Sequence, residues 1–473
     1  MKRWLFALLC LPLVVLAGTL PDLGDSSQSV LTPADEIRLG RRAMQDIRQQ
    51  PDFDNDPELT DYLNALGYRL VANSDQNSLD FHFFAIRDST LNAFSMPGGY
   101  VGINTGLIEA THNESELAGV MGHEIAHVTQ HHVARMIEAQ SRGVLPSLGM
   151  LALSILAARA NPQAAGGGIM ATEGLMAQKQ LDFSRDNERE ADRLGMRTMQ
   201  RAGFDPHAMV TFFQRLQQAT RLDEAHAIAY LQTHPLTSER IADMQNRVAA
   251  LPPVPVSDSI EYRLLREKLR VDDLPAETAP LVILNAIQQH QFHHADSQQY
   301  ALASAWLHAG QPEKAWGVWQ TLAHSNVHSP VIDMLGIRIQ ADQRHDQAVQ
   351  QMYADARLRY PDYLPLATGY ATWLLNHHQP GQALSIVNTA LQTSPDNALL
   401  YRLQSRGYAA EGHIFLSHYA QARSLYHDDA PQQAIAQLQI ALKSTDATFY
   451  NLSEAEADMQ QWQQEIQLQK GGH

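Results

Sequence analysis

Four histidines and one glutamate lie close together in residues 119–132, which read GVMGHEIAHVTQHH. Three of them, His123, Glu124 and His127, form the pattern H-E-x-x-H. On a helix, positions i and i+4 lie on one face about a turn apart, so both imidazoles can reach one metal ion. Glu124 lies beside them and can take a proton from a water molecule at that metal. A five-residue pattern also arises by chance, so further residues must support this interpretation.

The two remaining histidines of the stretch are poor candidates for a third ligand. His131 lies about 12 Å from His123 along a straight helix, which is too far for one ion. The longer pattern H-E-x-x-H-x-x-G-x-x-H also fails, because Gln130 and Val133 occupy its glycine and third histidine. We therefore expect His131 and His132 to be solvated or to support the ligands.

A third ligand is expected from another helix, since a catalytic zinc usually takes three protein ligands and keeps one position for water. The run FSRDNEREAD at residues 183–192 supplies Glu188 and Asp192, which share a helical face. One carboxylate can bind the metal while the other accepts a hydrogen bond from a histidine N–H and fixes its tautomer. Taken alone, the run is better explained as a solvated charged helix. Together with H-E-x-x-H, a metal site is favoured.

Capping residues predict the two helices that must position these side chains. Asn113, with Glu116 as the third helical residue, predicts the start of a helix that carries the histidines and runs to about Glu138. Ser184 predicts the start of the carboxylate helix, which ends near Gly203.

Upstream of these helices the sequence predicts two further helices and a small sheet. The helices start at Thr32 and Asp56, each of which is followed by proline. A Pro-Gly-Gly turn separates the second and third of three expected strands, at residues 80–86, 91–96 and 100–104.

H-E-x-x-H followed some sixty residues later by E-x-x-x-D resembles the M48 metallopeptidases, a gluzincin-type group. The resemblance implies that His123, His127 and Glu188 bind one zinc ion per chain. It implies Glu124 as the general base in peptide-bond hydrolysis, and Asp192 as a support for the ligands.

The same resemblance suggests a substrate strand. Residues Ala93, Phe94, Ser95 and Met96 resemble the edge strand beside the metal in this family. An edge strand has unpaired N–H and C=O groups and can take an extended peptide as an added strand. An ordinary hairpin strand also accounts for the local composition.

A late motif, Thr233-His234-Pro235 followed by Arg240, is similar to a histidine motif of these peptidases. His234 could bind the developing oxyanion. It could instead bind zinc as a fourth ligand, displace the water and switch the enzyme off. A surface His-Pro turn is the third alternative.

Residues beyond 276 predict helix after helix with an internal repeat. Similar segments place Ala315, Ala348 and Ala383 at intervals of 33 and 35 residues. A period near 34 built from helix pairs resembles tetratricopeptide repeats, and an unrelated helical bundle is the alternative. The next similar segment, at Ala434, comes only after 51 residues, so we expect an irregular cap there.

Composition limits the partners and the compartment. With 35 Lys and Arg against 51 Asp and Glu, the formal net charge is −16, which argues against binding nucleic acid. Residues 1–17 have the charged, apolar and small-residue regions of a cleaved secretory signal. The one cysteine, Cys10, lies within it, so the mature chain would form no disulfides.

One apolar segment, residues 144–158, lies between the two predicted ligand helices. It is too short to span a bilayer. It could be a lid over the active-site cleft, a surface for peripheral membrane or partner contact, or plain core. We favour a lid, because the glycines that follow can act as hinges.

We therefore predict an α+β chain that is mostly α. Its parts are a signal peptide at 1–17, a gluzincin-like peptidase domain with a small antiparallel sheet at 18–250, a linker and connecting helix at 251–275, and an α-solenoid of tetratricopeptide repeats at 276–473.

The combination of signal, M48 motif and repeats resembles the periplasmic members of the family. It implies a zinc endopeptidase of the periplasm that degrades misfolded or stalled outer-membrane proteins and assists their assembly, with a latch restraining its activity. The repeats would bind clients or the outer-membrane assembly machinery. The alternative is a chaperone or scaffold of outer-membrane assembly whose metal site is largely latent.

Overall fold

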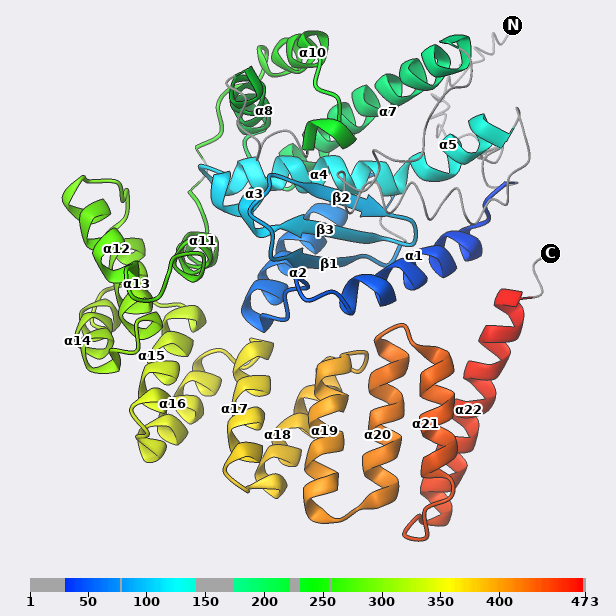
Figure 1. The fold of residues 1–473 in the computed structure, drawn as a ribbon, viewed down its shortest axis with the longest axis vertical. Coiled ribbons are helices and arrows are strands. Elements are labelled where there is room, and N and C mark those ends of the chain that lie inside the picture. The colour runs from blue at the N-terminus through cyan, green and yellow to red at the C-terminus, as the bar shows by residue number, and fades with distance from the viewer. Residues whose placement is uncertain (1–29, 77–78, 142–173, 222–229, 256, 471–473) are drawn as a thin grey trace, which may run out of the picture.

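The computed structural model describes residues 30–76, 79–141, 174–221, 230–255 and 257–470. The predicted signal peptide at 1–17 and the apolar segment at 144–158 lie outside them. The described chain is mostly helical with one small sheet (Figure 1), which confirms the predicted fold class. Within these ranges, no helix combines the length and the apolar character needed to cross a bilayer.

The helices before the repeats begin where capping residues were expected in three cases. The side chains of Thr32, Asp56 and Asn113 each accept a hydrogen bond from a backbone N–H in the first turn of the helix that follows. The three capped helices are α1, α2 and α4. The helices described before the repeats are α1 (Pro33–Arg48), α2 (Pro57–Val71), α3 (Thr105–Ala110), α4 (Glu114–Thr129), α5 (His132–Ser141), α7 (Gly174–Arg201), α8 (Pro206–Arg221) and α10 (Ser238–Val248).

The sheet is mixed, so the predicted antiparallel sheet is wrong for one of its two strand pairings. Its strands, in the order β1-β3-β2, are β1 (His82–Ile86), β3 (Tyr100–Asn104) and β2 (Ala93–Met96). Strand β3 pairs antiparallel with β2 and parallel with β1. Only β2 and β3 are joined by a tight turn, in which Gly98 and Gly99 have φ values of 79° and 89°. Strand β3 therefore returns from β2 into the position beside β1, and there it runs in the same direction as β1.

Two helix boundaries differ from the predictions. The histidine helix does not continue to Glu138, because the chain turns at His131, whose φ is 50°, and restarts as α5. This turn brings His131 Nδ1 to 2.8 Å from Glu36 Oε2 of α1. The carboxylate helix starts at Gly174, so Ser184 lies inside it and is not its cap. The residues between them are mostly good helix formers, which extend the helix past the capping signal.

The repeats are helix pairs with a strict period. Gly310, Arg344, His378 and Gly412 separate the helices of four successive pairs, at intervals of 34 residues, and all have positive φ. The fourth pair is therefore centred on Gly412. The predicted irregularity lies beyond this pair, because the next turn with positive φ, at Asp429, follows Gly412 after only 17 residues, and the two helices after it have 11 and 22 residues. The pairs are α13 (Ala295–His308) with α14 (Pro312–Ala323), α15 (Pro330–Asp342) with α16 (Asp346–Arg359), α17 (Leu364–Asn376) with α18 (Pro380–Thr393), and α19 (Ala398–Glu411) with α20 (Ile414–His427).

Further helices flank these pairs: α11 (Ile260–Asp272), α12 (Ala279–Gln288), α21 (Pro431–Ala441) and α22 (Phe449–Lys470). The repeats curve back beneath the peptidase part, with α17 below α2 and α20 to α22 below α1 (Figure 1). One buried cluster runs from Leu63 of α2 through Tyr262 of α11 to Leu335 of α15. This core is continuous across the predicted boundaries near residues 250 and 275 and does not mark where one domain ends. The domain boundaries therefore stay a prediction.

Candidate metal centre

The two helices that carry the predicted ligands cross with their backbones in contact. At the crossing lie Gly122 of α4 and Gly195 of α7. A Cβ atom on Gly195 would lie 2.8 Å from the backbone N of His123, closer than such atoms approach in real structures. The absence of both side chains therefore lets the ligand face of α7 reach that of α4.

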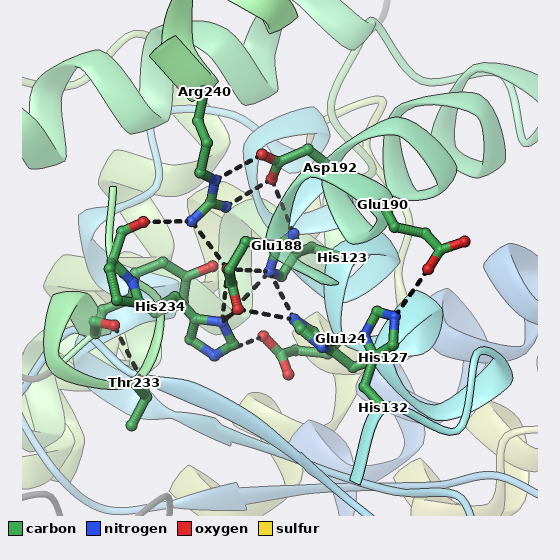
Figure 2. Close-up of polar contacts among 12 residues, drawn as sticks. His123, Glu124, His127, His132, Glu188, Glu190, Asp192, Thr233, His234 and Arg240 are labelled. Atoms are coloured by element: carbon green, nitrogen blue, oxygen red, sulfur yellow. Dashed lines mark hydrogen bonds and ion pairs between the residues drawn. The ribbon is translucent and has the colours of Figure 1, made fainter. Parts of the chain in front are cut away.

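Four side chains converge at this crossing, and Figure 2 shows them pointing toward one another. His123 Nε2 lies 3.0 Å from His127 Nε2, 3.3 Å from Glu188 Oε2 and 3.4 Å from His234 Nδ1. Glu188 Oε1 lies 3.4 Å from His127 Nε2 and 3.2 Å from His234 Nδ1. One ligand atom from each of the four lies within 4.8 Å of the others, and all four residues are buried.

This donor set fits a zinc ion. Zinc–nitrogen bonds of about 2.0–2.1 Å at tetrahedral angles separate neighbouring ligand atoms by about 3.4 Å, close to the distances observed. Imidazole and carboxylate are also ligands that zinc prefers. His123, His127, Glu188 and His234 could therefore hold one ion together.

His234 reaches the cluster from a helical turn at residues 230–233. Its backbone N–H donates to the carbonyl of Tyr230 at 2.8 Å, and its ring stacks on the Tyr230 ring with the centroids 4.7 Å apart. Its Nε2 lies 3.3 Å from Glu124 Oε1, and this contact is drawn in Figure 2. The two nitrogens of one imidazole thus face the metal ligands and Glu124 at once. The surface His-Pro turn is wrong, because His234 is 0% exposed.

Glu124 is a buried carboxylate beside the metal ligands. It is 0% exposed, and neither of its oxygens has a hydrogen-bond partner in the part of the chain that the structure describes. Its ion-pair contact with His234 is the one given above. Burial of a carboxylate without a partner costs free energy. Glu124 would gain such a partner from a water molecule at the metal, or from His234 when that ring covers it.

Asp192 and Arg240 form hydrogen bonds and ion pairs that fix two of the converging side chains, His123 and Glu188. Asp192 Oδ1 lies 3.1 Å from His123 Nδ1. Arg240 donates to both Asp192 oxygens, through Nε at 2.7 Å and Nη2 at 2.8 Å. Burial alone would raise the pKa of Asp192, but Arg240 and His123 hold it below its usual range. A third nitrogen, Arg240 Nη1, lies 2.9 Å from Glu188 Oε2 and donates to the Pro235 carbonyl at 2.8 Å.

A second supporting chain holds His127, and sequence reasoning missed most of it. His132 Nδ1 lies 2.7 Å from His127 Nδ1, and His132 Nε2 lies 3.3 Å from Glu190 Oε2. Arg135 donates to the same oxygen at 2.8 Å. The hydrogen bond to His132, together with Arg135, lowers the pKa of Glu190 to about 2 against the opposing effect of burial. His132 is therefore a support, one of the two roles expected for it. Glu190 lies in the same acidic run as Glu188, but its sequence position alone predicted no role for it.

The predicted substrate strand, which holds Ala93, Phe94, Ser95 and Met96, is β2, and it forms one edge of the sheet. A small hollow lies between the end of this strand and the metal-binding helix. Its lining includes Ser95 and Met96 of β2 together with His127 of α4. An extended peptide that paired with β2 would therefore pass beside a metal ligand.

Comparison with known proteins agrees with this geometry. The model of Peptidase family M48 matches residues 57–248. The putative beta-barrel assembly-enhancing protease of Vibrio cholerae serotype O1 is 38% identical over 310 residues, which are 65% of this chain and 64% of that protein. The beta-barrel assembly-enhancing protease of Escherichia coli K12 is 32% identical over 440 residues, or 90% of each chain. The mitochondrial metalloendopeptidase OMA1 of Schizosaccharomyces pombe is 33% identical over 185 residues, which are 39% of this chain and 51% of that protein.

The region that matches the family model contains the whole cluster, from His123 to Arg240. The similarity to the Escherichia coli protease extends over nearly the full length of both proteins, repeats included. The chain is a metallopeptidase and belongs to the M48 family.

Proposed function

We propose that this chain is a zinc endopeptidase of the periplasm that is restrained by its own His234. The observation that carries the proposal is the double contact of the His234 ring. Its Nδ1 lies 3.4 Å from His123 Nε2 and 3.2 Å from Glu188 Oε1, and its Nε2 lies 3.3 Å from Glu124 Oε1. A fourth protein ligand in this position would exclude water from the metal and cover the general base.

In the active state, His123, His127 and Glu188 would hold zinc, with His234 withdrawn. Zinc supplies a Lewis acid that polarises the scissile carbonyl and lowers the pKa of a water molecule. Glu124 would accept the proton of the attacking water and pass it to the leaving amine. The client would pair with β2 in an extended conformation, so recognition would depend mainly on unfolded backbone.

Substitution of His234 by alanine tests the latch against the oxyanion role. We expect His234→Ala to raise casein hydrolysis about tenfold or more with zinc content retained, because a non-catalytic ligand would be lost. His207→Ala, on α8 and paired with Asp205 at 2.8 Å, is the matched control and should leave the rate unchanged. Loss of nearly all activity in His234→Ala would instead assign His234 to the oxyanion.

We also propose that the clients are misfolded or stalled outer-membrane proteins, and that the repeats bind them or the outer-membrane assembly machinery. Support comes from the names of the relatives, which are called beta-barrel assembly-enhancing proteases. The predicted secretory signal is compatible with this location. In cells depleted of the chain, Glu124→Gln should fail to clear a stalled outer-membrane protein that the wild type removes.

A scaffold role remains the second candidate, because a site covered by His234 leaves the chain free to bind without cutting. The same Glu124→Gln variant separates the two functions. If it restores assembly of outer-membrane proteins while proteolysis is lost, the scaffold role exists beside the peptidase. If assembly fails as it does without the chain, the peptidase alone accounts for the function.

A further inference from the structure

A cavity of about 310 Å³ lies where the peptidase part meets the repeats. Its walls come from α2, from the first residue of α4, from α11 and the residue just before it, from the first residue of α15, and from Tyr363 just before α17. Figure 1 shows where these helices lie. It shares no lining residue with the metal centre. Its size is at the lower end of the range for small-molecule sites.

Four carboxylates line this cavity, and two of them are satisfied by neighbours. Glu114 accepts hydrogen bonds from the Tyr62 hydroxyl at 3.0 Å and from the Ser259 hydroxyl at 2.7 Å. Glu261 accepts one from the Ser329 hydroxyl at 2.8 Å. These two carboxylates therefore serve mainly to join the elements around the cavity.

The other two carboxylates are Glu58, which leaves one buried acceptor without a partner among the described residues, and Asp61. Glu58 is 1% exposed, and its Oε2 binds Lys268 and Arg338, whereas its Oε1 has no hydrogen-bond partner among the described residues. Tyr363 also lines the cavity. Its hydroxyl is buried and has no hydrogen-bond partner among the described residues. Burial raises the pKa of Asp61 to about 6. Such groups are costly unless a ligand completes them.

One basic side chain, Arg69, lines the cavity, but its guanidinium is engaged elsewhere. It donates to the Ala202 carbonyl through Nε at 3.0 Å and Nη2 at 2.6 Å, and it packs over the Phe204 ring at 4.2 Å. Tyr62 and Ser259, whose hydroxyls bind Glu114, also line the cavity, and the rest of the lining is apolar: Ala65, Leu66, Leu265 and Pro330. The cavity thus combines the carboxylate of Asp61 and one unpartnered oxygen of Glu58 with a hydrocarbon wall. Because Lys268 and Arg338 already balance the charge of Glu58, Asp61 is the main anionic group for a ligand.

We propose that this cavity binds an organic ammonium group on an alkyl stem, with the ammonium at Asp61 and Glu58. Three N–H donors would match the two carboxylates and the Tyr363 hydroxyl. The methylene stem would pack on the apolar wall. A calcium ion fits less well, because it takes six to eight oxygen ligands and gains nothing from that wall. The ammonium could belong to a free diamine or to a lysine side chain of a bound polypeptide.

Isothermal titration of the full mature chain in 150 mM NaCl tests this site. The probes are 1,4-diaminobutane, the peptide acetyl-Ala-Lys-Ala-amide, and the same peptide with norleucine in place of lysine. We expect saturable one-to-one binding of the diamine, of the lysine peptide or of both, and none of the norleucine peptide. Binding of the diamine alone identifies a free amine as the ligand, and binding of the peptide alone identifies a polypeptide.

Variants separate this cavity from the acidic surface in general. Asp61→Asn should weaken amine binding at least tenfold, and Tyr363→Phe should weaken it about two- to fivefold. Glu456→Gln, which removes an exposed carboxylate of α22, should change nothing. A norleucine peptide that binds as tightly as the lysine peptide, equal binding by wild type and Asp61→Asn, or no heat with either amine would each overturn the proposal. Asp61→Asn should fold normally, because it removes a negative charge whose burial destabilises the folded chain.

Discussion

Asp192 Oδ1 lies 3.1 Å from His123 Nδ1 while both Asp192 oxygens accept hydrogen bonds from Arg240. The ligand on α4 is therefore oriented by a carboxylate of α7, which is itself fixed by a guanidinium of α10. Arg240 also holds the carbonyl of Pro235, next to His234. Ligand orientation and the position of the proposed latch thus depend on one buried side chain.

Substitution of Asp192 by asparagine should weaken zinc binding about 10- to 100-fold, the usual effect of removing a partner that orients a ligand. Competition with a chromophoric chelator measures the affinity. Asp186→Asn is the control, because Asp186 lies on the same helix with its side chain 74% exposed. Equal affinities in the two variants would contradict the orienting role.

A methyl group at the crossing of α4 and α7 should disturb the site without touching a ligand. Gly195→Ala should lower the free energy of unfolding by about 1–3 kcal/mol through overpacking and should weaken zinc binding, since its Cβ would press on the backbone of His123. Gly317→Ala in α14, where nothing lies within 4 Å of the new atom, should be neutral or stabilising. Thermal unfolding and zinc titration of both variants check this. Intact zinc affinity in Gly195→Ala would show that the crossing tolerates movement.

The turn residues of the repeats predict stability changes of opposite sign. His378 is exposed and has φ 56°, where a side chain other than glycine costs about 1 kcal/mol. His378→Gly should therefore stabilise the chain by about 0.5–1 kcal/mol. Gly412→Ala, at the equivalent turn of the next pair with φ 79°, should destabilise it by a similar amount. Denaturant unfolding measures both, and changes of the same sign would refute the explanation.

The raised pKa of Asp61 predicts a pH dependence of stability. Its folded-state pKa of about 6 exceeds the ordinary value of 3.8, so the protonated form is the one that the fold favours. The stabilisation is complete below pH 3.8 and is lost as the pH rises through about 6. Relative to Asp61→Asn, wild type should therefore lose about 1–3 kcal/mol of unfolding free energy between pH 4 and 7. Denaturant unfolding at a series of pH values measures the difference, and a constant difference would contradict the assignment.

Local sequence signals singled out His123, His127, Glu188 and Asp192 because these four residues lie on two long helices with regular spacing. His123 and His127 share a face through the i, i+4 rule, as do Glu188 and Asp192. The contribution of Glu190 could not be predicted, because it depends on the turn at His131. The left-handed backbone conformation of His131 in that turn cannot be predicted from composition or from hydrophobic periodicity.

The sheet topology and the fourth repeat were harder for physical reasons. Strand pairing depends on long-range packing, so the strand positions could be read from the sequence but the parallel pairing of β1 with β3 could not. In the repeats, alanine spacing was a weaker marker than the turn residue. Glycine, arginine, histidine and glycine occupy equivalent turns, and they share a backbone conformation and not a chemistry.

The contact between Tyr100 and Asp429 links the far end of the repeats to the sheet. The Tyr100 hydroxyl donates to Asp429 Oδ2 at 2.7 Å, and Tyr100 pairs across the sheet with Met96 of β2. Arg41 and Arg48 of α1 also form ion pairs with Asp429. A force that pulled the last helices away would therefore act on α1 and, through Tyr100, on the strand pairing with β2. If the repeats held a client protein, tension on that client would then also act on β2, the strand proposed to bind it for cleavage.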